Sequence, residues 1–184
     1  MPSYLPHCLN AILSQSVRPN EVIIVDDGST DNSVEVILEF TKRYSFIKLI
    51  LNKENLGVEL TNLKGLENAT CDYVIFTAAD DYFLPGFFEK SLKLLAKHPE
   101  AGLCSTLCRR VNENEEYLDT VPEVPYMLNS QGYIPPQRMQ EIMLTRDNWA
   151  IMPATAIYNL KLMKEAKAMP VESGKYADGF AVTL

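Results

Sequence analysis

Hydrophobic residues recur along the chain at two spacings, one typical of helices and one typical of buried strands. Residues 4–14 carry apolar side chains every three or four positions, which predicts an amphipathic helix. Residues 22–25 (VIIV) are all apolar, which predicts a strand buried on both faces. The same patterns predict further helices over 34–44, 58–68 and 85–98 and further strands over 46–51, 73–78 and 101–107. This alternation indicates an α/β fold with a parallel sheet between layers of helices.

The pattern is weaker in the second half of the chain. Residues 112–125 are rich in acids, contain two prolines and predict an exposed loop or a hairpin. Helices are predicted over 135–146 and 160–168, with a short strand over 154–158. Because the sequence contains no internal repeat, we interpret residues 1–184 as a single domain.

Composition narrows the classes of function. A chain of 184 residues with 47% hydrophobic and 22% charged residues fits one globular domain with a sizeable core. The net charge of -7 argues against a protein that binds nucleic acid. The four cysteines form no CxxC pair, which favours free thiols over a zinc site. No apolar run is long enough to span a membrane and no leader is evident, so we expect a cytoplasmic protein, with association at the inner membrane surface left open.

Two of the predicted strands end in pairs of carboxylates. Asp26 and Asp27 follow the strand at 22–25, and Asp80 and Asp81 follow the strand at 73–78. Ligands of open parallel sheets bind beyond the carboxyl ends of the strands, so two central strands would bring these acids together. Turn and helix-capping roles would explain each acid singly, whereas two acid-tipped strands together favour a ligand site.

Three chemistries use acids at such a position. The first is that of enzymes with a nucleoside cofactor, but the chain lacks the glycine-rich loop that dinucleotide enzymes and methyltransferases would need. A haloacid-type phosphatase would need a nucleophilic aspartate where this chain has Val25. Sugar transfer from a nucleotide diphosphate needs hard oxygen ligands for a divalent cation, acceptors for the base and ribose, and a general base. The acidic strand ends suit this third chemistry.

Two segments carry a specific resemblance, YLPHCLNAILSQSVRPNEVIIVDDGSTDNSVEVI and NKENLGVELTNLKGLENATCDYVIFTAADDYFLPGFFEK. They resemble family 2 glycosyltransferases of the GT-A fold over roughly the first hundred residues. The resemblance implies a Rossmann-like, mostly parallel sheet flanked by helices. It also implies Mg²⁺ or Mn²⁺ at Asp80 and a donor nucleotide site made by Asp26, Asp27, Ser29, Asn55, Gly57 and Asp80.

The sequence departs from the family pattern in two places. The family motif F-L-D-A-D-D reads F-T-A-A-D-D, so Ala78 replaces the first acid of the DXD motif, which should weaken binding of the cation or ribose. The family's first strand, V-S-V-I-I-P-x-Y-N, has no counterpart before the helix at residues 4–14. We therefore expect either a chain truncated at both ends or another segment in the place of that strand.

The resemblance also implies a general base well after the DXD motif. Asp178 in KYADGFAVTL is the candidate, and a cap on a final helix is an equally good interpretation. We thus expect residues 1–109 to bind a nucleotide-diphospho sugar, UDP-linked by family frequency, and residues 110–184 to form an incomplete acceptor side. The expected reaction is inverting transfer to a hydroxyl of a glycan or lipid-linked acceptor, as in polysaccharide biosynthesis. The alternative is a non-catalytic nucleotide-sugar-binding domain that acts through a partner.

Overall fold

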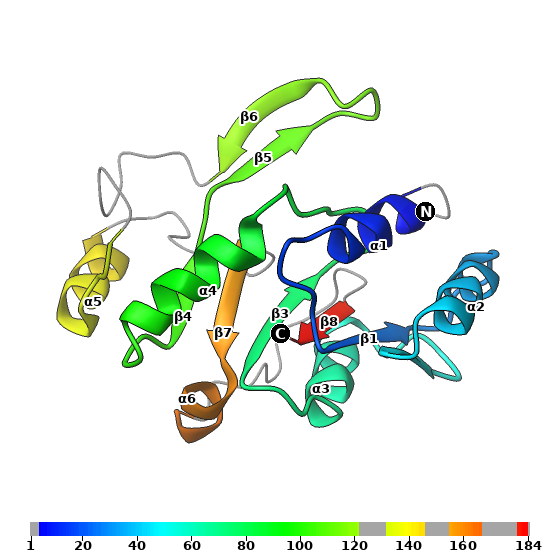
Figure 1. The fold of residues 1–184 in the computed structure, drawn as a ribbon, viewed down its shortest axis with the longest axis horizontal. Coiled ribbons are helices and arrows are strands. Elements are labelled where there is room, and N and C mark those ends of the chain that lie inside the picture. The colour runs from blue at the N-terminus through cyan, green and yellow to red at the C-terminus, as the bar shows by residue number, and fades with distance from the viewer. Residues whose placement is uncertain (1–3, 122–131, 146–154, 167–179, 184) are drawn as a thin grey trace.

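Figure 1 shows the computed structural model, which describes residues 4–121, 132–145, 155–166 and 180–183. The helices of these ranges are α1 (Leu5–Leu13), α2 (Ser33–Arg43), α3 (Val58–Glu67), α4 (Phe87–Lys97), α5 (Pro136–Thr145) and α6 (Leu160–Glu165). The strands are β1 (Glu21–Asp26), β2 (Ile47–Leu51), β3 (Tyr73–Thr77), β4 (Leu103–Ser105), β5 (Cys108–Val111), β6 (Tyr117–Val121), β7 (Ala156–Asn159) and β8 (Phe180–Thr183). The helices and strands predicted from residue periodicity are therefore confirmed, with ends that shift by a few residues.

Six strands form the main sheet in the order β2-β1-β8-β3-β7-β4. Strands β1 and β2 pair in parallel, whereas β8 pairs antiparallel with both β1 and β3. Strand β7 is likewise antiparallel to both of its neighbours, β3 and β4. Four strands (β2, β1, β3 and β4) thus run in one direction, and β7 and β8 run in the other.

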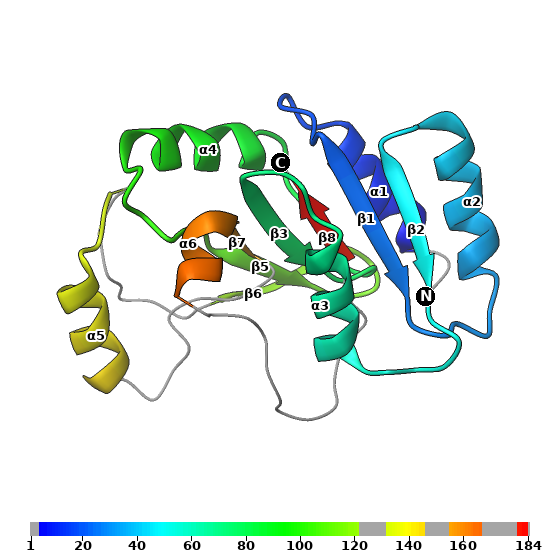
Figure 2. The same ribbon diagram turned by 90° about the horizontal axis from the view of Figure 1, so that it is seen from below.

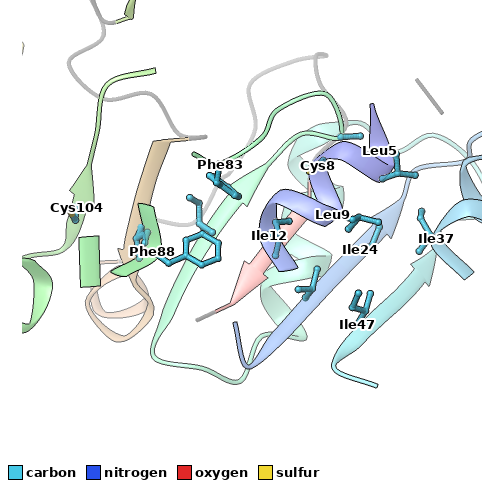
Figure 3. Packing of buried hydrophobic residues seen from close by; sticks show 14 of the residues in the cluster. Leu5, Cys8, Leu9, Ile12, Ile24, Ile37, Ile47, Phe83, Phe88 and Cys104 are labelled. Atoms are coloured by element: carbon cyan, nitrogen blue, oxygen red, sulfur yellow. The ribbon is translucent and has the colours of Figure 1, made fainter. Parts of the chain in front are cut away.

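Helices cover both faces of this sheet, as Figure 2 shows. The side chains of β1 alternate between the faces because successive residues of a strand point in opposite directions. Val22 and Ile24 belong to the larger core cluster with buried residues of α1, α2 and α4 (Figure 3). Ile23 and Val25 belong to a second cluster with Leu66 of α3 and its neighbours. The uninterrupted apolar run therefore reflects burial on both faces.

Strand β8 differs from the secondary structure that was predicted for the end of the chain. The segment after Asp178 was expected to form a helix, but residues 180–183 form a strand. Its register places Ile24 and Thr77 on either side of Phe180, so β8 is a central strand of the sheet, between β1 and β3. Aromatic and β-branched residues such as Phe180, Val182 and Thr183 favour strands when neighbouring strands offer unpaired backbone groups.

The second half of the chain also contains a hairpin that is separate from the main sheet. Strands β5 and β6 form a separate two-stranded antiparallel sheet, with Arg109 opposite Thr120 in its register. This hairpin confirms one of the two interpretations of the acidic segment that follows Arg109. In the ranges given above, no helix has the length and apolar character needed to cross a membrane.

Candidate functional site

The two acidic strand ends lie at the same edge of the sheet. Strands β1 and β3 run in the same direction, because β8 pairs antiparallel with each of them. Phe180 of β8 pairs with Ile24 on one side and with Thr77 on the other, so these positions are level across the sheet. Asp26 ends β1, and the segment from Ala78 to Asp81 follows directly after β3. The sheet thus brings together the two acidic pairs that the sequence singled out.

The turn after β1 packs backbone to backbone against the loop before α3. Gly28 has a φ of +78°, a conformation that favours glycine. A Cβ atom built on Gly28 would lie 3.1 Å from the backbone nitrogen of Asn55 and 3.1 Å from the carbonyl carbon of Glu54. The D-D-G-S turn and the N-x-G loop, which are separate motifs in the sequence, therefore form one structure.

Asp27 is held by that loop. Its Oδ1 atom accepts hydrogen bonds from Nδ2 of Asn52 and from the backbone N–H of Leu56, both at 2.8 Å. Its Oδ2 atom accepts one from the backbone N–H of Gly57, also at 2.8 Å. Burial alone would raise the pKa of Asp27, but these donors, together with the Thr61 hydroxyl, outweigh it, and the pKa lies below its ordinary value.

Asp26 has a different environment. Its side chain is as buried as that of Asp27, with 8% relative exposure for each residue. Among the described residues its carboxylate accepts one hydrogen bond, from the backbone N–H of Ser29 to Oδ2 at 3.1 Å. A carboxylate offers about four acceptor positions, so Asp26 keeps acceptor capacity for a ligand.

Asn55 and Gly57 complete this side of the site. Gly57 has a φ of +84° and is the N-cap residue of α3. Its N–H is shared between Asp27 and Oδ1 of Asn55, which lies at 3.1 Å. The Asn55 side chain is otherwise exposed, so its amide group is accessible from solvent.

The acidic pair after β3 is exposed and forms a tight turn. The Asp81 backbone N–H donates to the carbonyl oxygen of Ala78 at 3.3 Å. Although Asp81 as a residue is exposed, protein atoms around its carboxyl raise its pKa, and the neighbouring charge of Asp80 raises it further. The charge of Asp80 thus lies close enough to affect the Asp81 carboxyl, and a bound cation would relieve this repulsion.

The segment that follows helix α1 binds the residues that come after this turn, and the sequence did not reveal these contacts. Gln15, only 6% exposed, donates to the carbonyl oxygens of Phe83 (3.4 Å) and Leu84 (3.1 Å), and its Oε1 accepts from the N–H of Phe88 (3.4 Å). Burial raises the pKa of the Cys8 thiol to about 12, and the charges of Asp81 and Asp80 add to this effect.

A shallow groove lies beside the acidic turn. It has a volume of about 370 Å³ and is lined by His7, Asn10, Ala11, Ser14, Tyr82, Phe83, Leu84 and Pro85. The rings of His7 and Tyr82 meet edge to face, with centroids 4.4 Å apart. Its lining is mostly apolar, and it opens next to the carboxylates.

The acidic turn fits a divalent cation of one particular kind. In the part of the chain that the structure describes, no group of three or more His, Cys, Asp or Glu side chains is arranged to hold a metal. Mg²⁺ is often held by one or two carboxylates and takes its other ligands from phosphates and water. Asp80 and Asp81 offer that donor set, so they suit a cation that arrives with a phosphorylated ligand.

The candidate general base and one nearby lysine complete the account of the site. Asp178, the candidate general base, lies outside the described residues. Lys64 donates from Nζ to Oδ1 of Asn52, so its charge is used within the network around Asp27. The structure therefore unites the predicted residues of the first hundred positions and leaves the general base undescribed.

Comparison with known proteins gives a family match. The model of the family described as "Glycosyl transferase family 2" matches residues 2–166. An uncharacterized glycosyltransferase of Escherichia coli K12, YibD, is 38% identical over 82 residues, which cover 45% of this chain and 24% of YibD. Glycosyltransferase GlyA of Streptococcus pneumoniae is 33% identical over 96 residues, which cover 52% of this chain and 14% of GlyA. The chain thus matches less than a quarter of the length of these relatives.

Solved structures show the same fold. TarS 1–349 of S. aureus, in complex with UDP-GlcNAc, aligns with a TM-score of 0.62 and 21% identity over 91% of this chain and 44% of the TarS 1–349 chain. The mannosyltransferase PcManGT from Pyrobaculum calidifontis, in complex with GDP-Man and Mn²⁺, aligns with a TM-score of 0.64 and 18% identity. That alignment covers 97% of this chain and 46% of PcManGT. At these identities the likeness concerns the fold.

Proposed function

Because the chain belongs to glycosyl transferase family 2 and has a GT-A type fold, we propose that it transfers a sugar from a nucleotide-diphospho sugar to a hydroxyl group of an acceptor. The observation that carries the proposal is the arrangement at one sheet edge. There the buried Asp26 has spare acceptor capacity, and the exposed Asp80 and Asp81 follow β3, which runs in the same direction as β1 on the other side of β8. One end of this edge suits a nucleoside, and the other suits a diphosphate with its cation.

The donor nucleotide binds between the turn after β1 and the loop before α3. Asp26 accepts hydrogen bonds from the base or ribose, and Ser29 and Asn55 contribute exposed polar groups beside it. Asp27 and Gly57 belong to the same site through the backbone of the loop that they shape. UDP is the first nucleotide to test, and the neighbours bound to UDP-GlcNAc and GDP-Man support a nucleoside diphosphate sugar as the class of donor.

Asp80 holds the metal ion, Mg²⁺ or Mn²⁺, at the diphosphate end of the site. The ion, when bound, neutralises charge that develops on the leaving diphosphate. Asp81 lies beside Asp80 and assists it, whereas Ala78 supplies no carboxylate where family members carry the first acid of the DXD motif. A metal site with fewer carboxylates should bind the cation more weakly, so the diphosphate itself supplies much of the affinity.

The transfer step is a direct displacement that inverts the anomeric carbon. An acceptor hydroxyl oxygen forms a bond to the anomeric carbon while the bond from that carbon to the diphosphate oxygen breaks. Asp178 takes the hydroxyl proton as general base, and its sequence position two residues before Phe180, which pairs with Thr77, supports this role. The acceptor is a glycan or a lipid-linked sugar, and the setting is polysaccharide biosynthesis in the cytoplasm.

A second candidate function is binding of the nucleotide sugar without turnover, in a complex with a partner. Ala78 at the first position of the motif favours it, because a weakly held cation would stabilise the leaving group less. Release of UDP from a UDP-sugar, in the presence of Mn²⁺ and simple sugar acceptors, separates the two functions. Binding without release would support this second candidate.

The first experiment is calorimetric titration of UDP into the purified chain with and without Mn²⁺. We expect binding that needs Mn²⁺ and that weakens at least tenfold, about 1.4 kcal/mol, in an Asp80→Ala variant. Asp72→Ala is the matched control, because Asp72 is an exposed acid that precedes the same strand at its other end. An Ala78→Asp variant, which restores the missing acid, should bind UDP more tightly in Mn²⁺.

Two outcomes would contradict the proposal. One is the absence of UDP and GDP binding by a sample whose circular dichroism shows a folded α/β protein. The other is equal loss of binding in Asp80→Ala and Asp72→Ala, which would mean that the effect comes from net charge and not from the carboxylate at the strand end.

A further inference from the structure

The carboxylate of Asp27 is bound on both oxygens by its own chain. They accept three hydrogen bonds of 2.8 Å, from Asn52 and two consecutive backbone N–H groups, and the Thr61 hydroxyl helps to lower the pKa of the carboxyl. A carboxylate offers about four acceptor positions, so most of them are already used within the protein. With 8% exposure it also has little contact with solvent.

Asn52 links this carboxylate to the adjoining elements. Its backbone N–H donates to the carbonyl oxygen of Asp26 at 2.8 Å, which extends the pairing of β1 with β2 by one residue. Its side-chain oxygen accepts from Nζ of Lys64, and its Nδ2 lies 3.3 Å from Oγ1 of Thr61. The network therefore joins the tip of β1, the end of β2 and the first two turns of α3.

Asp27, which follows strand β1, also provides a cap for helix α3. Helix α3 begins after Gly57, and its N-cap residue has no side chain that could accept a hydrogen bond. The free N–H groups at a helix N-terminus favour an anion, and here the Asp27 carboxylate provides it for Leu56 and Gly57. A protein carboxylate thus lies at the start of α3, where it accepts from the N-cap residue Gly57 and from Leu56 before it.

The geometry of the loop depends on this cap. Asn55 lies in the loop that Asp27 holds, and its backbone lies against Gly28 in the turn that carries Asp26 and Ser29. Release of Leu56 and Gly57 would free Asn55 to move away from that turn. The hydrogen bonds of Asp27 therefore set the spacing between the two segments of the proposed nucleotide site.

We propose that Asp27 is a positioning residue that never contacts the donor nucleotide and that acts by holding residues 54–57 against the turn at residues 26–29. This inference rests on the proposed function of the site. It divides the adjacent acids between two roles, because Asp26 faces the nucleoside and Asp27 faces the protein.

The test compares two nucleotides and four proteins. UDP and CDP are titrated in Mn²⁺ into the wild type and into the variants Asp26→Asn, Asp27→Asn and Thr61→Val. Uracil donates a hydrogen bond from N3–H, whereas N3 of cytosine accepts one, so a carboxylate that contacts the base distinguishes the two. We expect Asp27→Asn to weaken UDP and CDP binding by the same factor, roughly five- to thirtyfold, and Asp26→Asn to change their ratio.

A second measurement follows the loop without any ligand. Amide hydrogen exchange of Leu56 and Gly57 should be slow in the wild type. In Asp27→Asn the exchange rate should rise by about the same factor as the affinity for UDP falls. Thr61→Val removes one donor and leaves the carboxylate, so it should fold normally and show both effects in the same direction, each below about fivefold.

The results separate the two proposals. If the wild type binds neither UDP, CDP nor GDP, the proposed function fails, and the exchange of Leu56 and Gly57 alone decides whether Asp27 holds the loop. A changed UDP-to-CDP ratio in Asp27→Asn would overturn the positioning role, because it would show contact with the base. Unchanged exchange of both amides in Asp27→Asn and Thr61→Val would overturn it as well.

Discussion

At the scale of single residues, the glycines show how local conformation and tertiary contact combine. Gly28 and Gly86 have nearly the same φ, +78° and +79°. A Cβ on Gly86 would meet only the flexible Lys90 side chain, at 3.6 Å, whereas a Cβ on Gly28 would meet backbone atoms at 3.1 Å. Gly102 has neither a positive φ nor a neighbour within 4 Å. These positions separate backbone strain from steric contact.

We therefore predict a graded loss of stability in alanine variants of these glycines. Gly86→Ala should lower the free energy of unfolding by about 1 kcal/mol, the usual cost of a left-handed conformation. Gly28→Ala should lower it by about 2–3 kcal/mol, because the loop at Asn55 must also move. Gly102→Ala should change it by less than about 0.5 kcal/mol. Urea unfolding measures all three, and equal costs at Gly28 and Gly86 would contradict the close contact of the turn with the loop.

At the scale of elements, a buried acid stabilises the end of the sheet that lies opposite the candidate site. Glu21 begins β1 and is 4% exposed. Its Oε1 accepts from the backbone N–H and the hydroxyl of Thr70, at 2.7 and 2.9 Å, and its Oε2 accepts from Nζ of Lys48 in β2 at 2.9 Å. One side chain thus connects β1, β2 and the segment between α3 and β3. This acid stabilises the sheet, in contrast to the acids at the other end.

Variants of this cluster should differ according to burial. Glu21→Ala should cost about 2 kcal/mol of unfolding free energy, because a charged acceptor of several hydrogen bonds is lost. Lys48→Met should cost less than about 0.5 kcal/mol, because the Lys48 side chain is half-exposed and exposed ion pairs contribute little. Glu21→Gln, which keeps one acceptor oxygen for Thr70, should lie between them. Chemical denaturation with each variant provides the measurement, and a larger loss in Lys48→Met than in Glu21→Ala would refute this assignment.

At the scale of the whole molecule, the core joins elements that are distant in the sequence. Cys8 of α1 and Cys104 of β4 belong to one hydrophobic cluster, although almost a hundred positions separate them. Cys8 is 1% exposed and Cys104 is 9% exposed, and burial raises the pKa of both thiols. Cys71 and Cys108 are only partly buried. The thiols therefore report on different depths of the same fold.

Their reaction with a thiol reagent should occur in three phases. In native protein at pH 8, Cys71 should react within minutes, and Cys108 should follow more slowly because burial and then Asp81 raise its pKa. Cys8 and Cys104 should react only at the rate of unfolding, since a buried neutral thiol supplies almost no thiolate. Peptide mapping after timed quenching identifies each site, and a Cys71→Ser variant should lose the fast phase. Modification of Cys8 as fast as Cys71 would show that α1 does not pack as described.

The order of helices and strands, and the choice of acids at two strand ends, followed from the sequence by itself. Helical and strand periodicities are local, and the run at residues 22–25 is apolar because both of its faces are covered. The D-D-G-S, N-x-G and A-A-D-D motifs are short and specific, so their residues could be named before any contact was known.

Only the tertiary structure decided which hydrogen-bond partners each of those residues has. Asp26 and Asp27 are adjacent and equally buried, yet Asp27 is bound by N–H groups 29 and 30 positions along the chain. The place of β8 between β1 and β3 was likewise hidden, because a short strand is selected by unpaired backbone groups of distant strands. The sequence determined which groups the chain carries, because patterns and motifs are local; the fold decided which of them meet, because hydrogen-bond partners are chosen across long separations.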